Sequence, residues 1–334
     1  MEHAPLIVIL FIVFVALLFD FLNGVNDAAN SIATVVSTRV LPPRFAVLWA
    51  AFFNFIAFLF FGVRVANMIG KGIVDTTVVN EQMVFAGLAG AVAWTHVCNT
   101  YGLPISVSHS LIGGLLGAAL VKAGPGALVM NGITKVVLFI FLSPLIGMCL
   151  GFICMIIVFW VFRKTKLKKL DRLFRRLQLV SAAMFSLGHG GNDAQKTMGI
   201  IAVLLFSAGY LGDTFHVPLW IVLTCHFVIA LGTLIGGWRV IKTMGMKITK
   251  LQPVGGFCAE TAGALTLFGA TWAGIPVSTT HTITGSIMGV GSTRGLASVR
   301  WTVARRIVCA WILTIPCAAL ASAGFYLIID LIRM

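Results

Sequence analysis

Two stretches of this strongly apolar chain place the same polar side chains at the same spacing. GVND (24–27) recurs as GGND (190–193), 166 residues later, and further polar residues follow the two copies at Asn30, Gln195 and Lys196. Carboxylate and amide oxygens are hard ligands that suit Na⁺, and a carboxylate can also carry a proton. Because a polar side chain in hydrocarbon must be paired or face water, the two copies predict a cation or proton site.

A second pair of motifs follows the first pair. GLPISVSHSLIGG (102–114) recurs as GIPVSTTHTITGS (274–286), at an offset of 172. In each copy Gly can end one helix, Pro suits the first turn of the next, and Ser or Thr can cap its free N–H groups. A helix that begins in mid-membrane presents those N–H groups and its positive dipole end to an anion. The hydroxyl ligands for an oxyanion would be Ser106, Ser108, Ser278, Thr279 and Thr280.

The Asn-Asp stretches themselves are poor helix-interior sequence. Residues 23–30 and 188–196 combine Gly, Asn and Asp, which favour turns and caps over helix interiors. We therefore expect both stretches to be unwound between half-helices. Irregular backbone at that depth is tolerated only where it is buried in protein or lines a cavity, so the four motifs are expected to surround one small wet site.

The composition is that of an integral membrane protein. The chain has 334 residues, of which 59% are hydrophobic and only 10% charged, against about 25% charged in soluble domains. Apolar runs long enough to cross about 30 Å of hydrocarbon lie near 5–22, 45–68, 131–162, 216–238 and 304–332. Shorter runs interrupted by Gly, Pro or polar residues lie near 28–38, 83–99, 103–121, 197–210, 256–272 and 275–291. We predict an all-α fold with about 10–12 membrane segments.

The ends of the chain and its cysteines add three smaller expectations. No basic segment precedes the first apolar run and no small-residue cleavage pattern follows it, so we expect a retained helix rather than a cleaved signal. The seven cysteines lack paired spacing, which argues against a metal site or disulfides among them. Apart from a coupling ion, Na⁺ or H⁺, we expect no cofactor.

The net charge of +14 follows from an uneven distribution of basic residues. Eight of the 24 Lys and Arg residues lie in 163–176, and ten more lie in the groups 39–44, 239–250 and 294–306. This is the positive-inside asymmetry of a membrane protein, and it removes the need for a nucleic-acid partner. It predicts that segment 163–177 is a cytoplasmic linker, able to contact anionic lipid, and that both termini lie outside the cell (inner or plasma) membrane.

The two pairs of motifs recur in the same order and divide the chain into two homologous halves, 1–162 and 178–334. Since the first half starts outside and the second starts inside, the halves would be inverted-topology repeats with broken or re-entrant helices. Secondary transporters are often built this way, with the substrate site near the midplane between the repeats.

The motifs resemble those of the inorganic phosphate transporter (PiT) family, whose members move phosphate with Na⁺ or H⁺. The family signature Gly-x-Asn-Asp is present once per half, and Pro-[Ile/Val]-Ser-x-[Ser/Thr]-His is present at 104–109 and 276–281. The resemblance covers essentially the whole chain. It implies a transporter, not an enzyme, that imports inorganic phosphate with a cation by alternating access.

The resemblance also implies roles for individual residues. The cation-coupling set would be Asn26, Asp27, Asn30, Asn192, Asp193 and Glu260, with Na⁺ held by the two Asn-Asp pairs. The phosphate set would be the five Ser and Thr residues of the second motif pair, together with Gln195.

Several alternatives remain open at this level. Glu260 is either a coupling-ion ligand or proton carrier, or a partner for another buried polar group, and the first half has no acid at the matching place. Lys196 either contributes positive charge to a binding site or pairs with an acid. Asp20 lies one turn before the first Asn-Asp stretch, and its role could be limited to pairing with that stretch.

The identity of the transported species is also open at this level. A sulfate or other oxyanion permease of the same fold, or an anion channel, is the alternative function. Phosphate near neutral pH still carries a proton, so an acceptor carboxylate such as Asp27 or Asp193 would favour it over sulfate. Arsenate, which is protonated like phosphate, should compete. The glycine-rich helices leave room for a homodimer.

Overall fold

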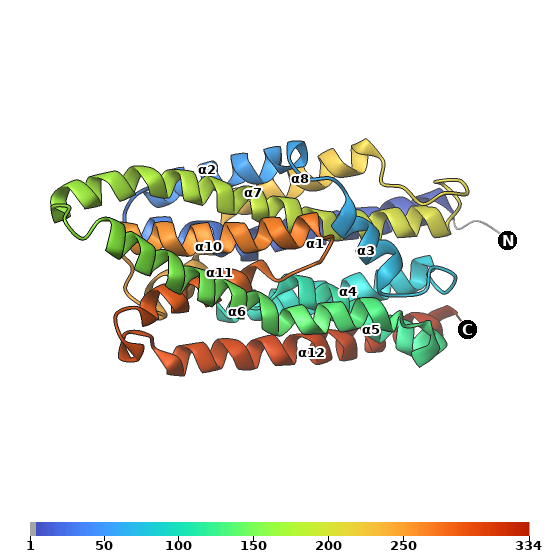
Figure 1. Ribbon diagram of the computed structural model, residues 1–334. Helices are drawn as coiled ribbons and strands as arrows, with labels where there is room; N and C mark the ends of the chain where they lie inside the picture. The colour runs from blue at the N-terminus through green and yellow to red at the C-terminus, as the bar shows by residue number, and fades with distance from the viewer. Residues whose placement is uncertain (1–4, 334) are drawn as a thin grey trace.

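The computed structural model describes residues 5–333, and in that range its regular elements are twelve α-helices and three short 3-10 turns (Figure 1). The α-helices are α1 (Leu6–Ser37), α2 (Pro43–Ile56), α3 (Arg64–Gly72), α4 (Glu81–Tyr101), α5 (Val107–Ala123), α6 (Met130–Val161), α7 (Leu167–Ser207), α8 (Leu219–Ile235), α9 (Trp238–Lys247), α10 (Pro253–Trp272), α11 (Thr279–Ser292) and α12 (Trp301–Arg333). The 3-10 turns are Ala57–Leu59, Pro125–Ala127 and Leu296–Ser298.

Within the described chain, three helices are long and apolar enough to cross a membrane on their own, namely α1, α6 and α12. Two bent pairs meet the same test when each is taken together: α2 with α3, bent by 80°, and α8 with α9, bent by 75°. Most of the large apolar side chains that remain exposed, such as Phe14 and Trp160, lie on these helices and suit a lipid environment. The predicted all-helical membrane fold is confirmed.

The helix breaks predicted in the second motif pair are present. Gly102 ends α4 and Gly274 follows α10, each with a positive φ, of 65° and 71°. After each break Ser106 or Ser278 caps the next helix, its hydroxyl accepting a hydrogen bond from the backbone N–H three residues on at 3.2 Å. The α4–α5 and α10–α11 breaks therefore follow from local glycine, proline and serine chemistry.

The breaks predicted at the Asn-Asp stretches are wrong, because α1 and α7 run through residues 23–30 and 188–196 without interruption. Their glycines are sites of close packing instead. A Cβ on Gly190 would lie 2.5 Å from the backbone oxygen of Asn54, and one on Gly24 would lie 3.0 Å from the Cα of Gly232. Close helix contact compensates the roughly 1 kcal/mol that a glycine costs a helix.

The polar stretches of α1 and α7 lie between two apolar cores. One core includes residues 9–19 of α1 and 194–205 of α7, and the other includes residues 29–35 of α1 and 174–185 of α7. The two helices therefore run in opposite directions between the same cores. Each Asn-Asp motif lies near the point where its helix passes from one core to the other.

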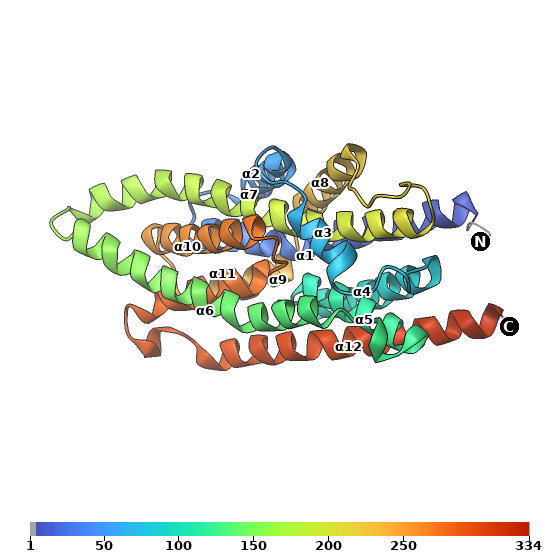
Figure 2. The ribbon, with the colours of Figure 1, turned by 45° about the vertical axis from the view of Figure 1, so that its right-hand side comes forward.

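The two broken helix pairs come from opposite ends of the bundle. In Figures 1 and 2, α10 and α11 lie toward the end that holds the α6–α7 turn, whereas α4 and α5 lie toward the other end. The predicted halves are interlocked, since α5 packs on α12 and α11 packs on α6. Glycines make both contacts close: Gly113 faces Ile315, and Gly285 faces Pro144.

The basic loops gather at the end of the bundle that holds the α6–α7 turn, opposite the start of α1 and the end of α12 (Figure 1). Arg175 donates to the backbone oxygen of Arg39, and Arg294 donates to that of Lys250. Since α7 begins at Leu167, most of the segment 163–177 is helical.

Candidate ion-binding site

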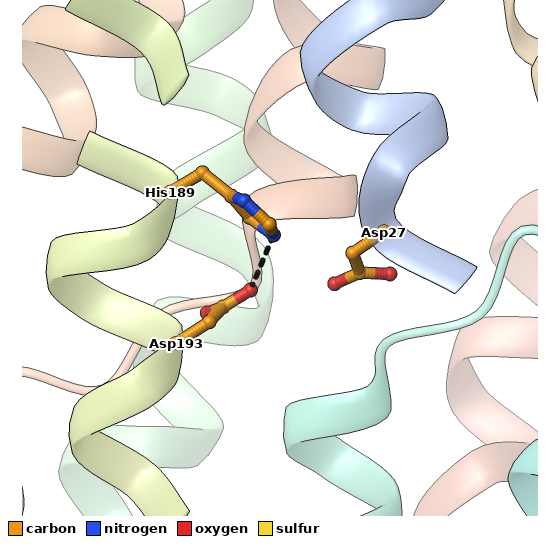
Figure 3. Close-up of side chains that lie close together, drawn as sticks. All are labelled: Asp27, His189 and Asp193. Atoms are coloured by element: carbon orange, nitrogen blue, oxygen red, sulfur yellow. Dashed lines mark ion pairs between the residues drawn. The ribbon is translucent and has the colours of Figure 1, made fainter. Parts of the chain in front are cut away.

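Two carboxyl groups from different helices face each other at the centre of the bundle. Asp27 of α1 points toward Asp193 and His189 of α7 (Figure 3), and all three side chains are buried. One carboxylate oxygen of each acid and a ring nitrogen of His189 lie within 4.8 Å of one another, an arrangement that could hold a cation. The predicted pairing of the two Asn-Asp motifs is thus present, although it comes from continuous helices.

The first turn of α11 connects the two carboxylates. The Thr279 hydroxyl lies 3.2 Å from Asp27 Oδ2 and 3.0 Å from Asp193 Oδ2, and its single proton can serve one of them at a time. Asn30 of α1 donates to this hydroxyl at 3.2 Å and to that of Thr280 at 3.0 Å. The predicted cation and anion ligands therefore share one network.

Lys196 brings a positive charge into this network. Its ammonium group donates to Asp193 Oδ1, to the hydroxyl of Ser108 in the first turn of α5, and to the backbone oxygen of Val277 just before α11. The side chain is 1% exposed. Lys196 therefore joins α7 to the starts of both α5 and α11.

The starts of α5 and α11 also meet directly. The rings of His109 and His281, each in the first turn of its helix, contact edge to face with centroids 4.7 Å apart. His281 stacks on Trp311 at 3.7 Å. Two helix N-termini, each with N–H groups that have no partner within the helix, thus point into the region of the two carboxylates.

The face of α1 around Asp27 consists of amides. Asn23, Asn26 and Asn30 are spaced with Asp27 so that all four lie on one side of the helix. Asn26 donates to Asp27 at 2.8 Å, but the amide oxygens of all three asparagines have no hydrogen-bond partner among residues 5–333. Buried amide oxygens without a donor are costly, and a cation would supply what they lack.

The orientation of His189 is fixed by a residue that the sequence analysis missed. Asn54 of α2 donates its amide N–H to Thr233 at 2.9 Å, which leaves its carbonyl oxygen to accept from His189 Nδ1 at 3.0 Å. His189 Nε2 therefore faces Asp193 at 3.2 Å. The only sequence signal for Asn54 was an amide in an apolar run.

Asn192 supports the α10–α11 break rather than the carboxylate pair. Its amide donates to Thr271 at 2.9 Å and to the backbone oxygen of Ile275 at 3.3 Å, and its carbonyl accepts from Val277 N at 3.3 Å. Its counterpart Asn26 makes no such contact, so the two Asn-Asp motifs are used differently.

Gln195 was predicted as a phosphate ligand, but its polar atoms serve helix contacts. Its carbonyl oxygen accepts from the backbone N–H groups of Val65 and Ala66 at 2.9 and 3.3 Å, at the start of α3, and its amide donates to Gly191 O at 2.5 Å. We therefore leave Gln195 out of the set of phosphate ligands.

Glu260 forms a second buried carboxyl site, away from the pair. Thr34 and Gln178 donate to one of its oxygens at 2.6 and 3.0 Å, and Ser181 donates to the other at 2.5 Å. Thr34 lies two helical turns beyond Asp27 on α1, a rise of about 10 Å. All of the hydrogen bonds found for Glu260 in the described part of the chain come from neutral groups.

A polar connection leads from Glu260 toward the basic end of the bundle. Thr38 donates to the carbonyl of Gln178 at 2.9 Å, and Thr38 also lines a cavity of about 400 Å³ with Arg39 and Arg175. Asp20, at the other side of the site, accepts from Thr197 at 3.0 Å and links α1 to α7.

The formal charges of the central site do not balance. Two carboxylates and one ammonium leave one net negative charge, and every one of these groups is buried. Because Nδ1 of His189 donates to Asn54, its Nε2 faces Asp193 favourably only with a proton between them, and that proton is one way to supply the missing positive charge. An isolated charge in a medium of low dielectric constant is strongly unfavourable. The arrangement therefore suits one additional cation or proton at the carboxylate pair, with neighbouring hydroxyls and helix N-termini available to an anion.

Comparisons with known proteins show the family of the chain. A profile described as "Phosphate transporter family" matches residues 23–322. The chain is 60% identical to a probable low-affinity inorganic phosphate transporter of Rhizobium meliloti over 95% of both chains, and 44% identical to one of Bacillus subtilis over 98% of both. It also superposes on a solved structure titled "The sodium-dependent phosphate transporter" with a TM-score of 0.87 and 27% identity, covering 97% of this chain and 99% of the other.

Proposed function

The chain belongs to the phosphate transporter family, and on that basis we propose that it imports inorganic phosphate together with a cation by alternating access. That it is an integral, multi-pass phosphate transporter and not an enzyme follows from the family. The coupling, the ligands and the mechanism are the proposal. The observation that carries it is the buried carboxylate pair, which has one negative charge more than Lys196 neutralises and is linked to the starts of α11 and α5 through Thr279 and Lys196.

Phosphate would bind between the starts of α5 and α11. Ser106 and Ser278 cap the two helices, and Ser108, Thr279 and Thr280 lie in their first turns. Free N–H groups and hydroxyls are suitable donors to a phosphate oxygen. The Lys196 ammonium, held against Ser108, adds positive charge at the same place.

The cation would bind on the Asp27 side of the pair. Asp27, Asn26 and Asn30 are on one helix face, and the unpartnered amide oxygens there are of the kind that coordinates Na⁺. Asp193 would be linked to this cation position through its hydrogen bond with the Thr279 hydroxyl. Asn192 would act indirectly, by fixing the backbone at the α10–α11 break. Glu260 would be a second, separate position for a cation or proton.

Alternating access would come from two inverted halves, 1–162 and 178–334. The opposite directions of α1 and α7 and the entry of the two broken pairs from opposite ends support this assignment. The shorter helices would complete about 10–12 membrane segments. The basic loops, including segment 163–177, would face the cytoplasm and both termini the outside.

The carboxylates would also select the anion. A protonated phosphate can donate to Asp27 or Asp193, whereas sulfate has no proton and would leave that acceptor unpaired, which is a strong penalty in a buried site. Arsenate should therefore compete with phosphate, and sulfate should not.

The test is uptake of radiolabelled phosphate by the full chain in liposomes under imposed gradients of Na⁺ or of pH. Uptake that saturates, accumulates phosphate against its gradient and stops when the cation gradient is removed would support symport. Uptake that equilibrates without a cation gradient would contradict it. Asp27→Asn should abolish accumulation, and Thr224→Ala, which removes an exposed hydroxyl that only bonds its own helix, serves as the control.

A further inference from the structure

The two halves of the central site differ at two positions, four residues before and three residues after the aspartate. At the offset of 166, Asn23, Asn26, Asp27 and Asn30 of α1 correspond to His189, Asn192, Asp193 and Lys196 of α7. Two of the four positions keep their residue type. The other two exchange a neutral amide for a side chain that can carry positive charge.

Around Asp27 the site offers oxygen ligands and contains no cationic group of its own helix. The amide oxygens of Asn23, Asn26 and Asn30 are buried, and within the described residues none of them has a donor. With the Asp27 carboxylate they form a set of hard oxygens on one helix face, which is the ligand type that a small alkali cation uses.

Around Asp193 an ammonium group of the same helix contacts the carboxylate and two further oxygen acceptors. The three hydrogen atoms of Lys196 Nζ are directed to a carboxylate, a hydroxyl and a backbone carbonyl, with Val277 O at 2.7 Å. These are the same ligand classes that Na⁺ uses, and three acceptors match the three donors of an ammonium group. The amide oxygen of Asn192 is also engaged, by Val277 N.

We propose that the Lys196 ammonium is a tethered cation that permanently fills the second of two equivalent cation positions, so that of this pair only the Asp27 position takes up a mobile cation. The inference rests on the proposed cation-coupled function and specifies its stoichiometry. With His189 in the same state in both cases, an amide in place of Lys196 would leave the two carboxylates with one more net negative charge and a need for one more mobile cation. With Lys196, each phosphate therefore moves with one cation fewer.

The decisive variant is Lys196→Asn, which gives the second half the amide of the first. In liposomes, initial phosphate uptake is measured against Na⁺ concentration, with choline as the replacement ion, and the charge moved per phosphate is measured from the current. Relative to the unmodified protein, K196N should require one additional Na⁺ per phosphate, seen as a steeper Na⁺ dependence and one more charge moved. Lys196→Met, which removes the charge and offers no oxygen, should be inactive at every Na⁺ concentration.

A binding measurement keeps the proposal testable if K196N does not transport. In detergent without phosphate, NaCl should raise the melting temperature of K196N more than that of the unmodified protein, because a ligand that binds only the folded state stabilises it. The reciprocal variant, Asn30→Lys, should lose Na⁺-dependent stabilisation.

Two outcomes would overturn the inference. An unchanged Na⁺ dependence in K196N with only a raised KM for phosphate would make Lys196 a phosphate ligand. An unchanged Na⁺ effect on melting would make it a structural tie between α7 and its neighbours. Failure of the proposed function would look different, since the unmodified protein would then not accumulate phosphate under any gradient.

Discussion

The two buried carboxyl sites of this protein are built in opposite ways. The Asp27–Asp193 site draws on both predicted halves and contains an ammonium group, whereas Glu260 is held by three neutral donors from α1 and α7. A carboxylate beside an ammonium is partly neutralised within the protein. A carboxylate that is surrounded by neutral donors is neutralised only when it binds a cation or takes up a proton.

The place in the first half that corresponds to the Glu260 site is apolar. At the offsets of the two motif pairs, Glu260 corresponds to Leu88, Gln178 to Ile12 and Thr34 to Ile200. These three residues belong to one apolar core. The central site therefore draws on matching positions of the two predicted halves, whereas the Glu260 site has no counterpart in the first half.

The largest effect is expected from breaking the charge pair of the central site. Asp193→Asn leaves the Lys196 ammonium buried without its carboxylate, which costs about 3–5 kcal/mol, enough to reduce uptake by at least about 100-fold. The measurements are the melting temperature in detergent and initial phosphate uptake. The double variant Asp193→Asn with Lys196→Met should regain melting temperature but not uptake, and equal stability of the single and double variants would contradict the pairing.

The next largest effect should come from Glu260, and it should differ in kind. Glu260→Gln keeps the size of the side chain but removes its charge, so the melting temperature should change little while uptake falls by roughly 10-fold or more. Phosphate binding in detergent should persist.

A control variant can copy the apolar counterpart into the second half. Glu260→Leu with Gln178→Ile and Ser181→Val installs the residues of the first half at these positions. It should fold without uptake. Normal uptake by either variant would mean that Glu260 is only a structural partner.

A smaller effect is expected from Asn54, the residue that orients His189. This effect should distinguish the central carboxyl site from the Glu260 site. Asn54→Leu removes the acceptor of His189 Nδ1, a loss of about 1–2 kcal/mol that corresponds to roughly 5–30-fold in the central site. The KM for the coupling cation should rise more than the KM for phosphate. Equal changes in both would indicate a general packing defect, for which Thr233→Val is the matched comparison.

The smallest effect is expected from the helix caps. Ser106→Ala and Ser278→Ala should each cost about 1 kcal/mol and raise the KM for phosphate about 5-fold, because each cap lies beside the proposed anion site. Asn80→Ala provides the control. The side-chain carbonyl of Asn80 caps α4 by accepting from Met83 N at 3.0 Å. This variant should lower stability similarly without changing the KM, and a similar KM change in all three would contradict the anion site.

Some features of the fold and site were predictable from the sequence, because their signals are local. Apolar runs mark the membrane helices, and Gly, Pro and Ser at residues 102–106 and 274–278 mark the two breaks, which are present as predicted. The motif pairs also predicted that Asp27 and Asp193 lie close together, since both occupy the same place in a repeat.

Only the tertiary structure decided what each glycine and each polar side chain contacts. The sequence predicts that Gly24 and Gly190 break their helices, yet both lie inside a helix where another backbone packs closely. The neighbouring backbone that makes glycine favourable there is distant in sequence. The partners of Gln195, Lys196 and Glu260 likewise come from helices far along the chain. Residue type and spacing determine which ligands a chain offers, whereas helix packing determines which of them remain free to bind an ion.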